Sequence, residues 1–348
     1  MKDNLTAVSL FTGAGGMDTG FENAGFDIIC ANEIDASAAE TYSANHPGTE
    51  MHVRDINRMM PEFSRFAGVD LVFGGPPCQG FSVVGKMDPC DERSQLIWSF
   101  FKAVRIIKPR AFVMENVKAL ADNARWSDVA GRIIKTAEGL GYDVSFKVLN
   151  AADYGVPQKR ERVFFAGLRD QCAESVFERA ESRRKPPRTI RDTFLALPAA
   201  GSPSNPLTCT AKIVPAASPI LRPSPYKGSL LFNGKGRLLD PSSIAGTIPA
   251  SLGGNNTPII DEHLLRHPED GDPMLEYHQE LLRGNLSPAL PDTLRRVTVT
   301  EVAALQTFPE GYAFHGSKSS IYHQIGNAVP CLLAEAVAGA LREALCQG

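Results

Sequence analysis

The sequence predicts an α/β protein, in which a sheet flanked by helices carries a second, smaller and irregular domain. Apolar, β-prone runs alternate with helical patterns up to about residue 170. The first such run ends in the glycine-rich turn Thr12-Gly-Ala-Gly-Gly, which is typical of a strand–helix connection. The alternation is lost in residues 171–293, where nine prolines fall within residues 186–225, and it returns in residues 294–348. Residues 1–170 and 294–348 are therefore predicted to form one discontinuous domain around residues 171–293.

Composition excludes several protein classes. With 348 residues, 43% hydrophobic and 22% charged, the chain has the make-up of a globular protein without a signal peptide or membrane span. Seven cysteines without a Cys-x-x-Cys pair fit a reducing cytoplasm and do not support a zinc site. The net charge of −3 does not indicate a nucleic-acid partner, but residues 193–239 carry five Lys/Arg and no acid.

The glycine turn is the first candidate ligand site. It follows a predicted strand at residues 6–11 and precedes a predicted helix at residues 18–24. Glycines allow a close approach of the backbone to a ligand, and a helix N-terminus favours a negative group. The spacing is not the dinucleotide fingerprint Gly-x-Gly-x-x-Gly, so a tight turn without a ligand stays open as the alternative.

Acidic residues stand at two successive strand ends. Glu33 follows a predicted strand at residues 26–31, and Asp55 lies near the end of one predicted at residues 51–56. An acid at the end of the second strand of a nucleotide-binding sheet is placed to hydrogen-bond ribose hydroxyls. The phosphate-binding Gly-Lys-Ser/Thr signature is absent, so the pattern favours an adenosine-containing cofactor without phosphates; solvated loop acids are the alternative.

Cys78 is a candidate nucleophile. A buried strand is predicted at residues 69–73, and Gly74-Gly-Pro-Pro then forms a stiff turn that delivers Cys78. Open α/β sheets place their sites at the carboxyl ends of strands, although a cysteine is also a common small core residue. Residues 83–93, polar and glycine-bearing, are predicted to form a lid.

Three charged residues follow later strands. Glu115 comes directly after a predicted strand at residues 111–114. It is either an exposed strand-end acid or a proton donor whose pKa is raised by burial. Arg160 and Arg162, two apart on a predicted strand, would share a face that binds phosphate or polarises a carbonyl oxygen.

Five blocks of the sequence carry a family resemblance. They are Phe11-x-Gly-x-Gly, Gly75-Pro-Pro-Cys-Gln-Gly-Phe-Ser, Glu115-Asn-Val, Gln158-Lys-Arg-Glu-Arg and Gln324-Ile-Gly-Asn. In this order they resemble the bacterial DNA (cytosine-5)-methyltransferases of restriction-modification systems, over residues 7–170 and 294–345. The resemblance implies a Rossmann-like mixed sheet that uses S-adenosyl-L-methionine, and a target-recognition domain in residues 171–293.

The resemblance also implies catalytic roles. Cys78 matches the nucleophile that adds to C6 of a flipped cytosine, Glu115 the residue at N3 and Arg162 the residue at O2. Arg160 is assigned to substrate or phosphate. The methyl donor leaves as S-adenosyl-L-homocysteine. By matching position, Phe11 lies against the adenine, Glu33 holds the ribose, and the remaining cofactor residues are Thr12, Gly13, Gly15, Gly16, Ile34, Asp55 (at the adenine amino group), Ile56, Pro76 and Asn327.

Double-stranded DNA is the implied substrate. Gln79 and Ser82 are candidates to support the flipped base or to fill the gap it leaves. In the recognition domain, Thr247 belongs to a short Thr-plus-aliphatic element, and the candidates for base contacts are Asn255 and Asn256 for adenine and Arg237 for guanine. Residues 261–280, with seven acids and one arginine, are expected to face away from DNA; His263 and His267 are not expected to bind a metal.

The return segment completes the prediction. Thr300 is predicted to cap a helix that runs through Gln306 and stops at Pro309. We therefore predict a site-specific DNA (cytosine-5)-methyltransferase, from a restriction-modification system or an orphan, acting as a cytoplasmic monomer without an obligate protein partner. An RNA methyltransferase with the same blocks and a catalytically silent DNA-binding relative remain as alternatives.

Overall fold

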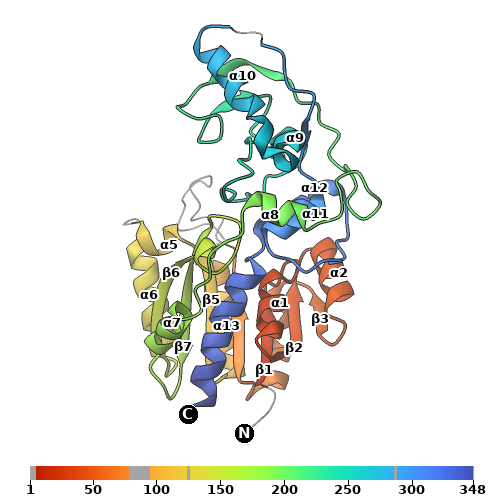
Figure 1. The fold of residues 1–348 in the computed structure, drawn as a ribbon. Coiled ribbons are helices and arrows are strands. Elements are labelled where there is room, and N and C mark those ends of the chain that lie inside the picture. Colours follow the sequence, from red (N-terminus) through yellow and green to blue (C-terminus); the bar gives the residue numbers. More distant parts are fainter. Residues whose placement is uncertain (1–4, 78–94, 124–125, 286–287, 348) are drawn as a thin grey trace.

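The protein has two lobes in the computed structural model, which describes residues 5–77, 95–123, 126–285 and 288–347. The larger lobe holds the sheet and both chain ends, and the smaller, irregular lobe lies above it in Figure 1.

The large lobe is built on a seven-stranded mixed sheet of order β3-β2-β1-β4-β5-β7-β6. Strand β7 is antiparallel to both of its neighbours, and the other adjacent pairs are parallel. The predicted mixed sheet is therefore confirmed. Its strands are β1 Leu5–Leu10, β2 Phe26–Glu33, β3 Glu50–Val53, β4 Leu71–Gly74, β5 Ala111–Val117, β6 Asp143–Asn150 and β7 Glu161–Leu168.

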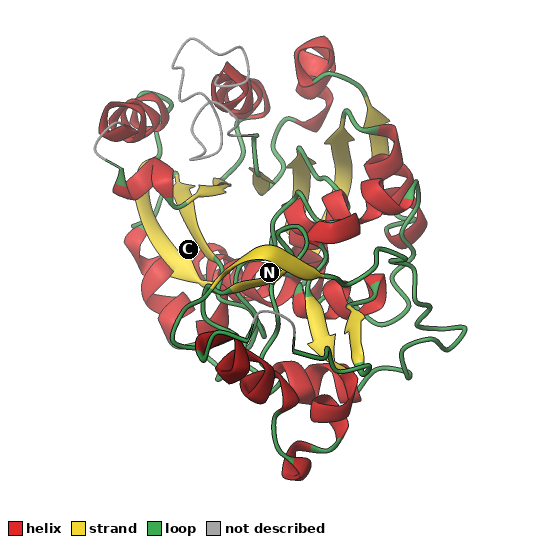
Figure 2. Cartoon of the chain, turned by 90° about the horizontal axis from the view of Figure 1, so that it is seen from above, coloured by secondary structure: helices red, strands yellow, loops and turns green. Residues whose placement is uncertain are grey.

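Helices cover both faces of this sheet, as Figure 2 shows from above. One hydrophobic cluster joins the sheet to three helices, α1 Gly16–Asn23, α7 Glu174–Glu181 and α13 Cys331–Cys346. A second cluster, on the opposite face, includes α3 Ile56–Met59, α4 Gln95–Ile107, α5 Ala119–Asp122, α6 Ser127–Glu138 and the 3₁₀ helix η1 Met60–Phe66. The C-terminal α13 packs beside the N-terminal α1, so the chain does return to the first domain (Figure 1).

The small lobe has short strands and long loops. Its described strand pairs are both antiparallel: β8 Pro215–Ile220 with β9 Leu230–Phe232, and β10 Ile259–Asp261 with β11 Leu294–Arg296. The prolines of this region explain the lack of longer strands, because proline cannot donate to a ladder. The helices of this lobe are α9 Glu262–Arg266 and α10 Pro273–Leu282.

A third layer of helices lies where the lobes meet (Figure 1). Helices α8 Ile190–Leu195, α11 Val299–Leu305 and α12 Lys318–Asn327 share one hydrophobic cluster with Ile248 and Leu252. Helix α2 Ala36–Asn45 of the large lobe packs beside α12.

Two local predictions are wrong. Thr298, not Thr300, caps α11: its side chain accepts from the N–H of Glu301, whose carboxylate accepts from the N–H of Thr298. Of these two threonines, only Thr298 is followed three residues later by an acidic residue, which a capping box requires. Likewise Asp55 is not on a strand; β3 ends at Val53, and Asp55 caps α3 by accepting from Asn57 N at 2.7 Å.

Candidate active site

The glycine turn after β1 has an unusual backbone. Phe11 has a φ of 58°, a conformation that is rare for a bulky side chain, and Gly13 and Gly15 have φ of 55° and 85°. Such outliers cluster at ligand sites, where the surrounding structure holds them in place. The position of this turn at the carboxyl end of a central parallel strand is where open α/β sheets bind ligands.

This turn is closed on one side and open on the other. A Cβ atom at Gly15 would lie 2.5 Å from His46 Nε2 and 2.7 Å from Tyr312 Oη, so only glycine fits there. A Cβ at Gly13 would meet no described atom within 4 Å. The backbone on the Gly13 side is therefore free to contact a bound molecule, as an adenosine-containing cofactor requires.

Glu33 lies against the same turn. At the end of β2, its Oε2 accepts from Gly13 N at 2.8 Å, and its Oε1 accepts from Ile34 N at 2.7 Å and Asp35 N at 2.9 Å. The predicted ribose-binding carboxylate is thus brought beside the glycine turn, and the side chain of Ile34 is 68% exposed next to it.

Asp55 follows the neighbouring strand at this edge. Asn32 in β2 donates to the carbonyls of His52 and Arg54 at 3.1 and 2.8 Å, which ties the ends of β2 and β3 together. Asp55 is half-buried and is the N-cap of α3, whereas Ile56 is buried in the core.

Glu115 faces the segment that leads to Cys78. Gly74 of β4 pairs with Met114 of β5, and a Cβ at Gly75 would lie 3.0 Å from Glu115 Oε2. The Asn116 side chain donates to Pro76 O at 3.1 Å and holds this segment in place. Cys78 itself, together with Gln79, Ser82 and the predicted lid at residues 83–93, lies outside the described residues.

Glu115 is 9% exposed and forms an ion pair with Arg162, with 3.0 Å between Oε1 and Nε. Burial raises the pKa of Glu115, while the charges of Arg162 and Arg160 act in the opposite direction. The net shift is upward, as the sequence predicts for a proton donor. A carboxyl group with a raised pKa beside a guanidinium group is suited to donate a proton to a bound ring and to stabilise negative charge on that ring's oxygen.

Arg160 does not lie where the sequence places it. The residue precedes β7 and is 1% exposed, and its guanidinium donates to Ile248 O at 2.9 Å, Gly326 O at 3.0 Å and Asn327 O at 3.5 Å. This corrects the expected contact with substrate or phosphate, because carbonyls from two other segments enclose the group. The sequence does not reveal this enclosure, since those segments are far away in the chain.

The amides of Gln158 and Gln306 extend this buried junction, and sequence analysis assigned neither a role. Gln158 donates to Gln306 Oε1 at 2.9 Å and accepts from Ile248 N at 2.8 Å. Gln306 donates in turn to Ile325 O at 2.7 Å. The position of Gln158 within a family block was the available signal.

Asn327 ends α12 beside the glycine turn. Its Nδ2 lies 2.9 Å from His323 Nε2, and its side chain is exposed. A Cβ at Gly16 would lie 2.7 Å from Val329 O, two residues later, so this segment and the glycine turn are in contact.

The predicted recognition residues lie on neighbouring loops of the small lobe. Arg237 and Asn255 are exposed, and Gly236 N donates to Asn255 O at 3.1 Å. Asn256 accepts from Lys235 N at 3.2 Å. Thr247 is exposed, but its hydroxyl donates to Lys159 O at 2.8 Å, so that it joins the small lobe to the segment before β7.

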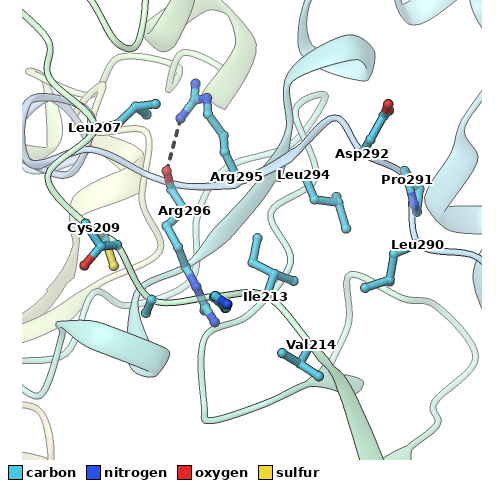
Figure 3. Close-up of a pocket in the computed structure, with 13 residues that line it drawn as sticks. Leu207, Cys209, Ile213, Val214, Leu290, Pro291, Asp292, Leu294, Arg295 and Arg296 are labelled. Carbon is cyan, nitrogen blue, oxygen red and sulfur yellow. Dashed lines mark hydrogen bonds between the residues drawn. The ribbon is translucent and has the colours of Figure 1, made fainter.

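A cavity of about 490 Å³ lies in the small lobe between residues 207–214 and 290–296 (Figure 3). Among its described lining residues, Arg295 is paired with Glu301, and Arg296 donates to Thr257 O at 2.7 Å. The described lining includes no residue of the seven-stranded sheet, so this cavity is separate from the candidate active site.

Within the described parts of the chain, no cluster of three or more His, Cys, Asp or Glu side chains is arranged to hold a metal ion. His263 pairs with Asp270 at 3.0 Å, and His267 pairs with Glu269 at 3.5 Å. None of the described helices is long and apolar enough to cross a membrane.

Comparison with known proteins gives consistent results. A family model described as C-5 cytosine-specific DNA methylase matches residues 5–343. The chain is 34% identical to the type II methyltransferase M1.HphI of Haemophilus parahaemolyticus, over 97% of this chain and 87% of that protein. It is 34% identical to the type II methyltransferase M.NgoPII of Neisseria gonorrhoeae, over 98% and 96%. The solved Dnmt2 methyltransferase of S. pombe shares the fold, with a TM-score of 0.65 at 20% identity over 98% of each chain.

Proposed function

Because this chain belongs to the C-5 cytosine-specific DNA methylase family, we propose that it methylates cytosine within one short sequence of double-stranded DNA, with Cys78 as its nucleophile. S-adenosyl-L-methionine is the methyl donor of this family and supplies the methyl group when bound. The target atom lies inside the base stack, so the cytosine is flipped out of the duplex before it reacts.

The protein groups act on the cytosine ring in sequence. The Cys78 thiolate adds to C6, which moves electron density onto C5, an atom too weak a nucleophile to be methylated unaided. Glu115 supplies or shares a proton at N3 as the thiolate adds, and Arg162 stabilises the negative charge that develops at O2. Once C5 has accepted the methyl group, whose donor leaves as S-adenosyl-L-homocysteine, loss of the C5 proton expels the Cys78 thiolate and releases 5-methylcytosine.

The cofactor is assigned to the edge formed by the glycine turn, β2 and β3. The open Gly13 side of the turn accommodates it, with the ring of Phe11 at the adenine and the carboxylate of Glu33 at the ribose. The other assigned contacts are Thr12, Gly15, Gly16, Ile34, Asp55, Ile56, Pro76 and Asn327. What supports this placement is the turn itself, which has a left-handed φ at Phe11 and an open side at Gly13.

For Arg160 we propose a positioning role in place of DNA contact. Its guanidinium joins the small lobe at Ile248 to the end of α12 at Gly326, close to Glu115. It thereby sets the position of the recognition lobe relative to the catalytic carboxyl. Arg237, Thr247, Asn255 and Asn256 remain the proposed DNA contacts of that lobe, with Gln79 and Ser82 at the flipped base.

We assign the protein to the bacterial cytoplasm, as the modification enzyme of a restriction-modification system or an orphan methylase that acts as a monomer. The names of the relatives as type II methyltransferases support this setting. Every assigned residue belongs to this one chain, so the proposed reaction uses no residue of a partner.

The observation that carries the proposed function is the ion pair of the buried Glu115 with Arg162, which faces the segment that leads to Cys78. We expect Glu115→Gln to lower kcat on duplex DNA by at least about 100-fold, the usual contribution of a general acid. Binding of S-adenosyl-L-homocysteine, followed by calorimetry, should be unchanged. The matched control is Glu161→Gln, a neighbouring glutamate that pairs with Lys118 at the surface. Equal turnover by the two variants would remove Glu115 from the mechanism.

A further inference from the structure

A hydrogen-bonded chain of side chains ends on the glycine turn from the side opposite its open face. Tyr312, in the return segment, donates from its hydroxyl to Ala14 O at 2.5 Å. The same hydroxyl lies 3.0 Å from Nε2 of His46, at the C-terminal cap of α2. Nδ1 of His46 in turn lies 2.8 Å from Oε2 of Glu22 in α1. Three segments that are distant in the sequence are thus joined at the carbonyl of Ala14.

Packing holds the two rings of this chain in place. His46 is 4% exposed and stacks on Tyr42 at 4.3 Å between ring centroids. The ring of Tyr312 contacts Phe308 at 4.7 Å and Phe314 at 5.2 Å. Because these ring contacts do not depend on the hydroxyl, removing that one oxygen leaves the packing of residue 312 in place.

A buried carboxyl group, that of Asp18, lies next to this hydrogen-bonded set of side chains. Asp18, in the first turn of α1, is 0% exposed and accepts from the hydroxyl of Tyr42 at 3.0 Å. Its charge interacts with His46. A connected set of polar groups therefore lies on the closed side of the turn.

We propose that Tyr312 is a positioning residue for the cofactor, in which a hydroxyl oriented by His46 fixes the peptide after Ala14 and so preorganises the glycine turn. The inference rests on the proposed placement of the cofactor on this turn. A turn that is already in its bound conformation saves the cost of ordering it on binding. The return segment thus completes the cofactor site without touching the cofactor.

The direct test is Tyr312→Phe, with Tyr322→Phe as the matched control. Tyr322 is a buried tyrosine of the same return segment, and its hydroxyl donates to the carbonyl of Val297 at 3.2 Å, away from the turn. Calorimetry on DNA-free protein should give a Kd for S-adenosyl-L-homocysteine that rises about three- to tenfold in Tyr312→Phe, the effect of one hydrogen bond. The Kd of the Tyr322→Phe control should change by less than about twofold. Equal Kd values for the two variants would overturn the proposal.

A second measurement separates positioning from general damage to the fold. In cofactor-free protein, hydrogen exchange of the amides in residues 13–16 should become faster in Tyr312→Phe and stay unchanged in Tyr322→Phe. In steady-state assays KM for the cofactor should rise while kcat at saturating cofactor stays the same. Slowed kcat with unchanged exchange and unchanged KM would contradict a positioning role.

His46→Gln provides a second variant in case Tyr312→Phe does not fold. It keeps Tyr312 and removes the ring nitrogen that orients its hydroxyl, so we expect a smaller rise in Kd with the same faster exchange of residues 13–16. Wild-type exchange and affinity in this variant would overturn the role given to His46.

Glu33→Ala distinguishes failure of this inference from failure of the proposed cofactor site. If Glu33→Ala weakens binding while Tyr312→Phe does not, the cofactor lies on the turn and only the positioning role is overturned. If neither variant weakens binding, the placement of the cofactor at this edge is wrong, and the inference falls with it.

Discussion

Asp18, which lies outside the candidate active site, has an unusual pKa. Burial raises its pKa from an ordinary value of 3.8 to about 6, against the lowering effects of His46, Ser9 and Tyr42. The folded protein therefore binds this proton more tightly than the unfolded chain does. The contribution of Asp18 to stability is most favourable below its unfolded pKa and is lost as the pH rises through its folded pKa, above which a buried charge remains.

We accordingly expect Asp18→Asn to stabilise the protein at neutral and alkaline pH. The amide keeps an acceptor for Tyr42 and removes the buried charge, which should add about 2 kcal/mol at pH 8 and about half as much at pH 5. Thermal melts across this pH range measure the effect, with the exposed Asp27→Asn as the control. A stabilisation that does not vary with pH would contradict the assignment of the raised pKa to Asp18.

At the residue scale, the sequence predicted Glu115 better than the arginine near it, although Glu115 lies within β5 and not after the strand. Glu115 follows a short apolar run, and such runs are recognised by composition alone. The burial of Arg160 depends on carbonyls of Ile248 and Gly326, which lie about ninety residues or more away in the chain. Side-chain partners at that separation leave no periodic signal, so its contact with phosphate was predicted wrongly.

Among the elements, α11 matters because it connects the small lobe to the end of the chain. Its capping box joins Thr298 to Glu301, and Arg295 of β11 forms an ion pair with the same Glu301. The start of α11 is therefore held both by Arg295 of β11 and by the capping box of the helix itself. This arrangement holds the cluster of α8, α11 and α12 against residues 245–252.

Thr298→Ala should cost about 1 to 2 kcal/mol of stability, because it leaves the N–H of Glu301 without its cap. Thr300→Ala, two residues later on the same helix, should cost less than about 0.5 kcal/mol. Thermal unfolding of the two variants side by side makes the comparison. A larger loss for Thr300→Ala would show that the helix begins where the sequence predicted it.

Elements of the sheet domain were predictable to within a few residues, whereas those of the small lobe were not. Strands β1, β2, β4 and β5 overlap the apolar runs that the sequence predicts to be strands. In the small lobe, β10 and β11 have three residues each and pair across more than thirty residues. Such pairs are too short to show alternation, and their formation depends on the surrounding cluster.

At the scale of the whole molecule, the large lobe and the small lobe are joined by a buried polar junction. Gln158, Arg160 and Gln306 connect Ile248 of the small lobe to the end of α12. The return of the chain to the first domain was predicted from its last family block, and in the structure α13 packs on α1. The partners of this junction were not predicted, because a glutamine in a sequence does not show whether its side chain is buried, and the family block of Gln158 gave the only signal.

The central claim is that this chain methylates C5 of cytosine in duplex DNA through Cys78. The most direct test is bisulfite sequencing of DNA from a methylation-free bacterial host that expresses the protein, beside a host that expresses Cys78→Ala. The account predicts protected cytosines confined to one short motif, and none in the Cys78→Ala host. A wild-type protein that is folded, binds its cofactor and protects no cytosine would contradict the claim, and would leave an RNA substrate or a catalytically silent DNA-binding role.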